Sequence, residues 1–183
     1  MKYNSVVISG LPGAGKGVLS KAVAQKYGWK LFSIGDMWRK KWEKEHPSKE
    51  IPFENYWKKA SFKEQNGINN LARQIIAEGQ AVGDFRYAIC CKGLPTLFVF
   101  IKSNLDNRAE RATKTKKYEG KQIAEIKKIL KDREKDEVMW GKKLFGKNYD
   151  FRDNSHYNLI LDSEHLTLQE EVALIDKELK DKL

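Results

Sequence analysis

The stretch Gly10-Leu11-Pro12-Gly13-Ala14-Gly15-Lys16-Gly17 decides the fold. It follows a β-branched run, 6–9, and precedes a segment, 16–27, with apolar residues at helical spacing. The glycines allow successive N–H groups to turn inward around a polyphosphate, the helix adds its positive end, and Lys16 can bridge the terminal phosphates. This context disfavours an ordinary glycine-rich turn and predicts a phosphate-binding loop. The residues expected to bind the phosphates are Gly10, Pro12, Gly13, Ala14, Gly15, Lys16, Gly17 and Val18.

The loop departs from the usual motif after its lysine. The motif carries Ser or Thr there, whose hydroxyl binds magnesium. This chain has Gly17 followed by Val18, and neither offers a hydroxyl. A metal ion has to be held by other groups.

Length and composition exclude several classes of protein. The 183 residues suffice for about one domain, and 40% hydrophobic with 33% charged residues is typical of a globular chain. No apolar run approaches the ~18 residues of a membrane span, and the first residues do not resemble a signal peptide. We therefore expect a single domain over 1–183, cytoplasmic and monomeric, without membrane contact. Cys90 and Cys91 are expected to be reduced core residues, since a disulfide between neighbours is strained.

Strands and helices alternate along the chain. Strands are expected at 6–9, 29–33, 81–83, 96–101 and 159–161. The alternation predicts an α/β fold, a P-loop three-layer sandwich with a parallel sheet of about five strands flanked by helices and ligands at the carboxyl ends of the strands.

Two segments are expected to stand apart from the sheet. Residues 37–65 contain prolines, aromatic residues and lysines, which suits a small projecting subdomain that moves. Residues 105–144 are helical in pattern and basic, with Ile123, Ile126 and Leu130 in one stripe and a break at Gly120. A closing helix is predicted after a capping box at 167–170.

The net charge of +10 has two explanations, a nucleic-acid partner or a small phosphate-rich ligand on a lysine-rich surface. The basic region 114–147 is interspersed with Glu and Asp, which favours a solvated helical face. A nucleotide-dependent nucleic-acid-binding protein stays as the less favoured alternative.

Beyond the loop, several motifs resemble the nucleoside monophosphate kinases, especially the short archaeal-like cytidylate kinases. The form Gly-x-Pro-Gly-x-Gly-Lys-Gly is similar to their phosphate loop, and 33–39 resembles the opening of their monophosphate-binding part. The segment 82–86 resembles their Asp-Gly-Arg strand end, and 145–162 the stretch before their last strand. Segments 108–111 and 131–136 resemble the arginine-bearing lid helices, which places a lid at about 111–135.

This resemblance implies an ATP-dependent kinase that transfers a phosphoryl group to CMP or a related monophosphate, with Mg²⁺ as cofactor and nucleotides as partners. Lys16 and the loop amides hold the donor phosphates, while Asp36, Arg39 and Arg86 form the acceptor site. Asp36 and Asp84 orient the ligands of magnesium through water. The catalytic residues implied are Lys16, Arg108, Arg111 and Arg133.

Each of these residues also has a structural interpretation. Asp36 suits a helix cap, and Asp84 suits a salt bridge with Arg86. Arg108 and Arg111 suit a solvated helix face. The three histidines show no ligand spacing and are assigned no chemistry.

Departures from the family pattern leave the acceptor open. Ile34 stands where the family often has Ser or Thr, and Val138 and Met139 follow where a second lid arginine is usual. The segment 84–87 lacks the glycine and the following acid of bacterial cytidylate kinases. Another P-loop small-molecule kinase and a degenerate nucleotide-binding protein are therefore retained as alternatives.

Overall fold

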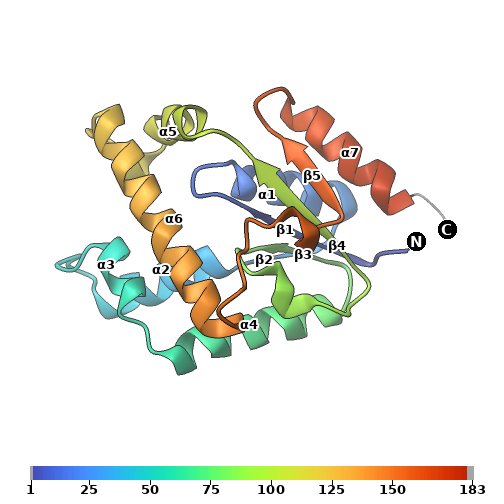
Figure 1. Cartoon of the computed structure of the whole chain (residues 1–183), viewed down its shortest axis with the longest axis horizontal. Coiled ribbons are helices and arrows are strands. Elements are labelled where there is room, and N and C mark those ends of the chain that lie inside the picture. The colour runs from blue at the N-terminus through green and yellow to red at the C-terminus, as the bar shows by residue number, and fades with distance from the viewer. Residues whose placement is uncertain (1, 181–183) are drawn as a thin grey trace.

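The computed structural model describes residues 2–180, except for the side chains of Glu54 and Lys116. Its centre is one five-stranded sheet of order β2-β3-β1-β4-β5, in which all neighbours are parallel (Figure 1). The strands are β1 Ser5–Gly10, β2 Lys30–Ser33, β3 Ala81–Asp84, β4 Thr96–Lys102 and β5 Leu159–Asp162. All five expected strands are present, and the predicted fold class is confirmed.

The helices cover the sheet on both faces. They are α1 Lys16–Tyr27, α2 Ile34–Glu45, α3 Phe53–Lys58, α4 Phe62–Ala77, α5 Leu105–Thr113, α6 Ile123–Phe145 and α7 Leu168–Lys180. Helices α1 and α7 pack on one face, around a core that includes Leu19, Ile175 and Leu179, all 0% exposed. Helix α4 packs on the other face (Figure 1).

Strand β1 is the buried middle of the sheet. All six of its residues are buried, and it pairs with both β3 and β4. The β-branched run favours an extended conformation, and parallel sheets covered on both faces require such continuous apolar strands. The phosphate loop therefore starts at the carboxyl edge in the centre of the sheet.

Capping residues fix where several helices begin. The Ser33 hydroxyl accepts from the Asp36 N–H at 3.2 Å, so Ser33 and not Asp36 caps α2. The predicted capping box before α7 is present, with Thr167 and Glu170 bonded reciprocally.

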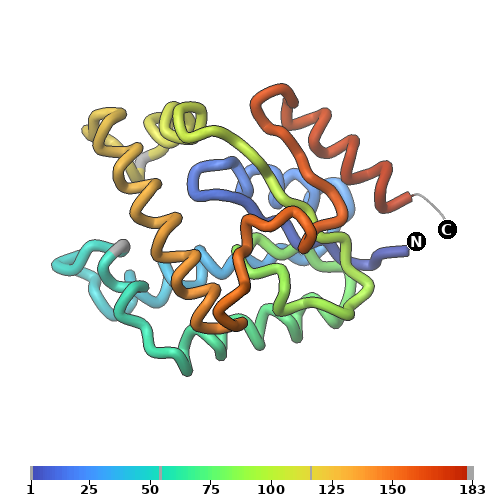
Figure 2. Tube along the Cα trace, in the orientation of Figure 1, coloured from blue at the N-terminus to red at the C-terminus, as the bar shows by residue number. Residues whose placement is uncertain are grey.

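The chain from 46 to 60 lies outside the sheet, beside α6 (Figure 2). Lys58 on α3 forms a 2.6 Å ion pair with Asp136 on α6. Between α5 and α6, Gly120 adopts a positive φ of 76°, which fits the expected break in the helical run. The stripe expected on α6 is wrong at one position: Ile126 and Leu130 are buried, but Ile123 is 46% exposed because it lies in the first turn.

The cysteines are free, as expected, with sulfur atoms 3.7 Å apart. Cys91 is buried and Cys90 is half-buried. Within residues 2–180, no helix combines the length and apolarity needed to cross a membrane.

Candidate functional site

The loop between β1 and α1 is built as an anion cradle. Gly13 and Gly15 have φ angles of 82° and 96°, a left-handed conformation that disfavours side chains. Gly15 caps α1 without a side-chain hydrogen bond, and of the first-turn N–H groups only that of Val18 donates to a described backbone oxygen, the Gly15 carbonyl, which leaves those of Lys16 and Gly17 for a ligand. The sequence motif thus has the geometry that binds phosphate groups.

Lys16 turns back over this loop. Its Nζ donates to the carbonyl oxygens of Gly10 and Leu11, at 3.2 and 3.3 Å. Burial, together with the nearby Arg86, lowers the pKa of the ammonium to about 7, although Asp84 and Glu137 oppose the shift. An incoming polyphosphate would favour the charged form, since opposite charge raises the pKa of an amine.

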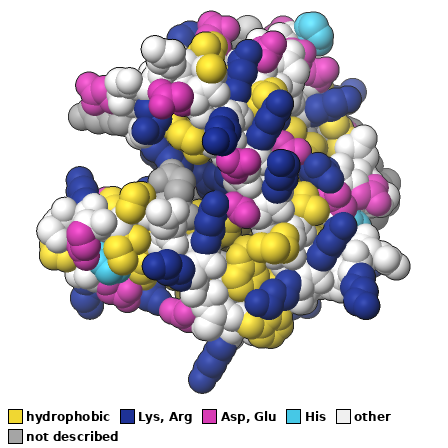
Figure 3. All heavy atoms as spheres, turned by 60° about the vertical axis from the view of Figure 1, so that its left-hand side comes forward, with side chains coloured by type: hydrophobic (Ala, Val, Ile, Leu, Met, Phe, Trp, Pro, Cys, Tyr) yellow, Lys and Arg dark blue, Asp and Glu magenta, His cyan; other side chains and the backbone are white. Residues whose placement is uncertain are grey.

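A cavity of about 540 Å³ opens beside the loop at the carboxyl ends of β1, β2 and β3. Figure 3 shows the molecule deeply hollowed on one side, with Lys and Arg side chains at the inner end of the hollow. The charged side chains that line the cavity are Lys16, Lys21, Asp36, Arg39, Asp84, Arg86, Arg111, Lys117, Arg133 and Glu137. The aromatic ones are Trp38, Phe53, Trp57, Phe85, Tyr87 and Tyr118. This combination of an aromatic wall and a cationic end suits a ligand with a ring and a phosphate.

Arg86 has a buried acidic partner that the sequence did not reveal. Its Nη2 donates to Oε1 of Glu137 at 2.8 Å, and its Nε lies 2.6 Å from Oε2 without hydrogen-bond alignment. Arg133 Nε donates to the same Oε1 at 2.9 Å. Burial disfavours the Glu137 carboxylate, but Arg86, Arg133 and Lys16 outweigh it and hold its pKa below the usual value.

Asp84 faces the end of the phosphate loop. Ser33 donates to its Oδ2 at 3.2 Å, and a Cβ added at Gly17 would lie 3.5 Å from the same oxygen. Since Arg86 pairs with Glu137, the structure gives no support to the salt bridge between Asp84 and Arg86. A carboxylate beside a phosphate loop is a fitting ligand for a hydrated magnesium ion, which prefers oxygen donors.

Asp36 and Arg39 form a second acid–base pair at the cavity wall. Arg39 Nη2 lies 2.5 Å from Asp36 Oδ1, and its guanidinium stacks 5.8 Å from the Phe53 ring centre. Both side chains are at least 41% exposed, so the pair itself adds little stability. Arg39 is thus free to exchange its partner for a ligand anion.

The two arginines of α5 lie close to the loop and not on a solvated face. Arg108 is 5% exposed, donates to the carbonyl of Pro12 at 3.1 Å and pairs with Glu134 at 3.2 Å. Arg111 donates to the carbonyl of Ala14 at 3.4 Å and to Ser163 Oγ at 2.8 Å. Arg111 lines the cavity, whereas Arg108 is not among the described lining residues and supports the loop from behind.

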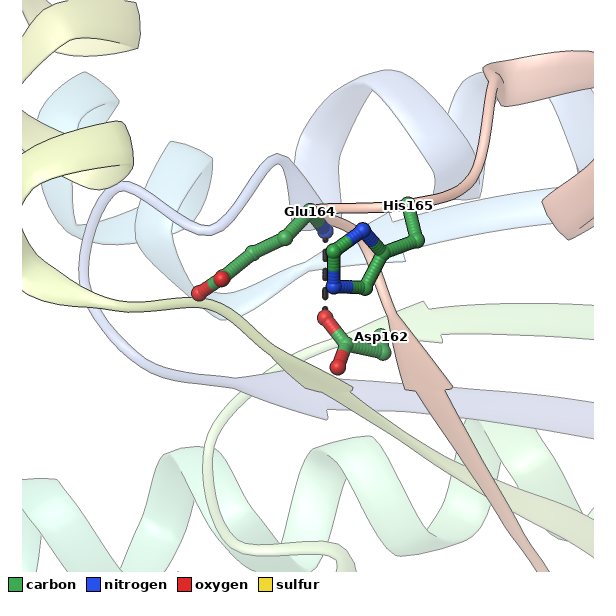
Figure 4. Close-up of side chains that lie close together, drawn as sticks. All are labelled: Asp162, Glu164 and His165. Carbon is green, nitrogen blue, oxygen red and sulfur yellow. Dashed lines mark hydrogen bonds between the residues drawn. The ribbon is translucent and has the colours of Figure 1, made fainter.

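One histidine lies in an acidic cluster outside the cavity lining. Asp162, Glu164 and His165 are all exposed and lie within 4.8 Å of one another after β5 (Figure 4). The carboxylates serve the local turn: Asp162 Oδ1 accepts from the Glu164 N–H at 3.1 Å, and Glu164 accepts from the Asn104 N–H. These contacts explain the cluster without a metal ion.

The sequence reasoning missed Glu137 and Ser33 as individual members of the site, and it assigned the aromatic residues of 37–65 mainly to packing within the projecting subdomain. Ser33 had a readable signal, because it is the last residue of a strand and precedes a helix. Glu137 had only its position four residues after Arg133, which many surface ion pairs share.

Comparison with known proteins identifies the family. The AAA domain family matches residues 9–130, which is more than half of the chain, and the chain belongs to this family. It is 29% identical to a cytidylate kinase of Methanopyrus kandleri, over 93% of this chain and 90% of that protein. It is also 29% identical to a cytidylate kinase of Methanocaldococcus jannaschii, over 86% and 87% of the two chains. The resemblance to cytidylate kinases that the motifs indicate is confirmed.

Solved structures share the fold at lower identity. An uncharacterized protein from Eubacterium ventriosum matches with a TM-score of 0.70 and 15% identity, and the match covers all of both chains. The shikimate kinase of Acinetobacter baumannii matches with a TM-score of 0.58 and 12% identity, over 97% of this chain and 93% of that one. A gluconokinase of Sinorhizobium meliloti matches with a TM-score of 0.57 and 16% identity, over 96% and 95%. The fold is therefore one that small-molecule kinases use.

Proposed function

We propose that this protein is an ATP-dependent nucleoside monophosphate kinase that acts on CMP or a related pyrimidine monophosphate. One observation carries the proposal: the phosphate loop with Lys16 opens into the same cavity as Arg39 and Arg86. Two anions can therefore meet there, a triphosphate on the loop and a monophosphate on the arginines. The cytidylate kinase relatives support the nucleotide class of the acceptor.

The donor side is the simpler half of the reaction. The loop amides and the Lys16 ammonium hold the β- and γ-phosphates of ATP and neutralise charge that moves onto the leaving oxygen. Arg111 lines the cavity near the loop and is the α5 arginine best placed to contact the transferring group. Arg108 keeps the loop in shape through the Pro12 carbonyl.

On the acceptor side, Arg39 and Arg86 bind the monophosphate and point one of its oxygens at the γ-phosphorus. That oxygen forms the new P–O bond as the bond to ADP breaks. The acceptor phosphate is already an anion at neutral pH, so no general base is required. The aromatic wall excludes water, which would otherwise accept the phosphoryl group.

Magnesium fits this site through Asp84. The carboxylate adjoins Gly17, where the usual loop hydroxyl is missing, and Ser33 holds its Oδ2. We expect Asp84 to bind the ion through water. Asp36 is the less favoured candidate, because its carboxylate already pairs with Arg39. Bound there, the ion would supply positive charge that neutralises the donor phosphates.

Coupled-assay turnover with ATP and magnesium against CMP, dCMP, UMP, AMP and GMP tests the proposal. Gluconate and shikimate belong in the same panel, because kinases of those names share the fold. We expect CMP or another pyrimidine monophosphate to be the best acceptor. Turnover of gluconate or shikimate alone would show another small-molecule kinase, and no turnover with any acceptor would show a degenerate nucleotide-binding protein.

A further inference from the structure

Among the described residues that line the cavity, Glu137 is the acidic side chain that pairs with Arg86. It is 6% exposed, and its carboxylate meets both Arg86 and Arg133. We propose that Glu137 is a positioning residue of the acceptor site, which holds the Arg86 guanidinium in the orientation that receives the acceptor phosphate. This inference rests on the proposed kinase function and deepens it.

The contacts of Arg86 show which part of it remains available. Nε and Nη2 face the Glu137 carboxylate, which occupies one edge of the planar guanidinium. Nη1 is buried, and no group in the described part of the chain accepts a hydrogen bond from it. An unsatisfied buried donor is costly, because it has lost its hydrogen bonds to water without gaining a partner. An oxygen of a bound phosphate would satisfy it, so the unpaired Nη1 points to a ligand.

The rest of Arg86 is already fixed by the fold. Its carbonyl accepts from Ser9 Oγ at 2.8 Å, and its guanidinium lies 5.2 Å from the Phe151 ring centre. The next residue, Tyr87, donates its hydroxyl to the carbonyl of Glu137 at 2.7 Å. Glu137 thus holds the segment 86–87 through both its carboxylate and its backbone.

One turn earlier on α6, Glu134 makes the corresponding contact on the donor side. It pairs with Arg108, which donates to the phosphate loop. Residues three apart share a helix face, so α6 presents one carboxylate towards the loop and one towards the acceptor. A change at Glu134 is therefore expected to act mainly on the binding of the donor, and a change at Glu137 mainly on the binding of the acceptor.

A carboxylate between two arginines could also act as an internal competitor of the acceptor phosphate. The geometry favours positioning, because Glu137 leaves Nη1 of Arg86 unpaired. The two roles predict opposite results when the charge is removed. Loss of a positioning carboxylate weakens acceptor binding, whereas loss of a competitor strengthens it.

Glu137→Gln tests the proposal, since it keeps the side-chain size and removes the charge. We expect the acceptor KM to rise tenfold to a hundredfold, the effect of misplacing a substrate-binding group by about 1 Å. The Kd for ATP should change by a much smaller factor than the acceptor KM. The control is Glu178→Gln on α7, which makes the same substitution outside the cavity lining and should leave the acceptor KM unchanged. An unchanged or lower acceptor KM in Glu137→Gln, or equal weakening of both substrates, would overturn the proposal.

Two further measurements keep the test decisive. If Glu137→Gln does not fold, Glu137→Asp takes its place. This variant retains the charge but moves it back by one methylene, and it should raise the acceptor KM by a smaller factor than the loss of the charge. Crystal structures of the wild type and of Glu137→Gln or Glu137→Asp should show the Arg86 guanidinium displaced in the variant, and an unmoved guanidinium would refute positioning. This readout needs no acceptor, so a failure of the kinase proposal in the turnover panel is distinguishable from a failure of this one.

Discussion

Replacing Lys16 with methionine is expected to abolish phosphoryl transfer and, at the same time, to stabilise the fold. The ammonium lies against the carbonyls of Gly10 and Leu11 in a poorly hydrated place. Methionine is similar in length but carries no charge. Turnover should fall at least about 10³-fold, the typical effect of removing a cation that contacts the transferring group.

The size of the stability change follows from the pKa of Lys16. Its pKa falls from 10.5 to about 7, and one pKa unit corresponds to about 1.4 kcal/mol. Protonating Lys16 in the folded protein below pH 7 therefore costs up to about 5 kcal/mol relative to the unfolded chain. The side chain is only partly buried by surface area, which weakens the penalty. Methionine cannot make the two hydrogen bonds to the carbonyls, and the loss of each one removes about 1 kcal/mol from this gain in stability. A net gain of about 1–3 kcal/mol is expected for Lys16→Met at pH 6.5.

The pH dependence gives the sign of the effect. The pKa is lowered in the folded state, so the penalty is full below pH 7 and disappears as the pH rises towards the unfolded value of 10.5. Urea unfolding of both proteins at pH 6.5 and 9.5 measures it, with transfer activity assayed in parallel. A variant that is less stable than the wild type at pH 6.5, or a difference that grows with pH, would refute the reasoning.

Three other substitutions probe separate parts of the site. Arg86→Lys should raise the acceptor KM at least about tenfold and leave the Kd for ATP within twofold, because lysine lacks the planar guanidinium group. Arg152→Lys, outside the cavity lining, is the matched control. Equal weakening of both substrates in Arg86→Lys would contradict the assignment. Gly10→Ala should destabilise the protein by several kcal/mol in urea unfolding, since its Cβ would lie 2.7 Å from the Ile101 carbonyl oxygen; wild-type stability would exclude this packing. Val18→Thr adds a hydroxyl at a position 61% exposed and should tighten ATP binding about two- to tenfold by calorimetry, whereas unchanged affinity would show that the hydroxyl does not reach the phosphates.

The phosphate loop and the sheet were predictable because their signals are local. A β-branched run, the glycines and Lys16 occur in consecutive positions, and the chemistry they support depends on backbone conformation alone. The helix ends were predictable where a capping residue marks them, as at Thr167.

The acid partners of the site were not predictable, because they depend on contacts between distant segments. Glu137 stands in a helix rich in Lys, Asp and Glu, where a carboxylate usually faces water. Its burial arises because the end of β3 brings Arg86 against α6, 51 residues further along the chain. The same long-range packing buries Arg108, for which a solvated face was an open alternative.

A crystal structure of the protein with CMP and a non-hydrolysable ATP analogue tests the central claim most directly. We predict that the triphosphate lies in the loop between Gly13 and Gly17, with Lys16 on its terminal phosphates. We also predict that Arg39 and Arg86 hold the CMP phosphate in line with the γ-phosphorus. A triphosphate bound elsewhere, or a CMP phosphate without contact to either arginine, would contradict the account.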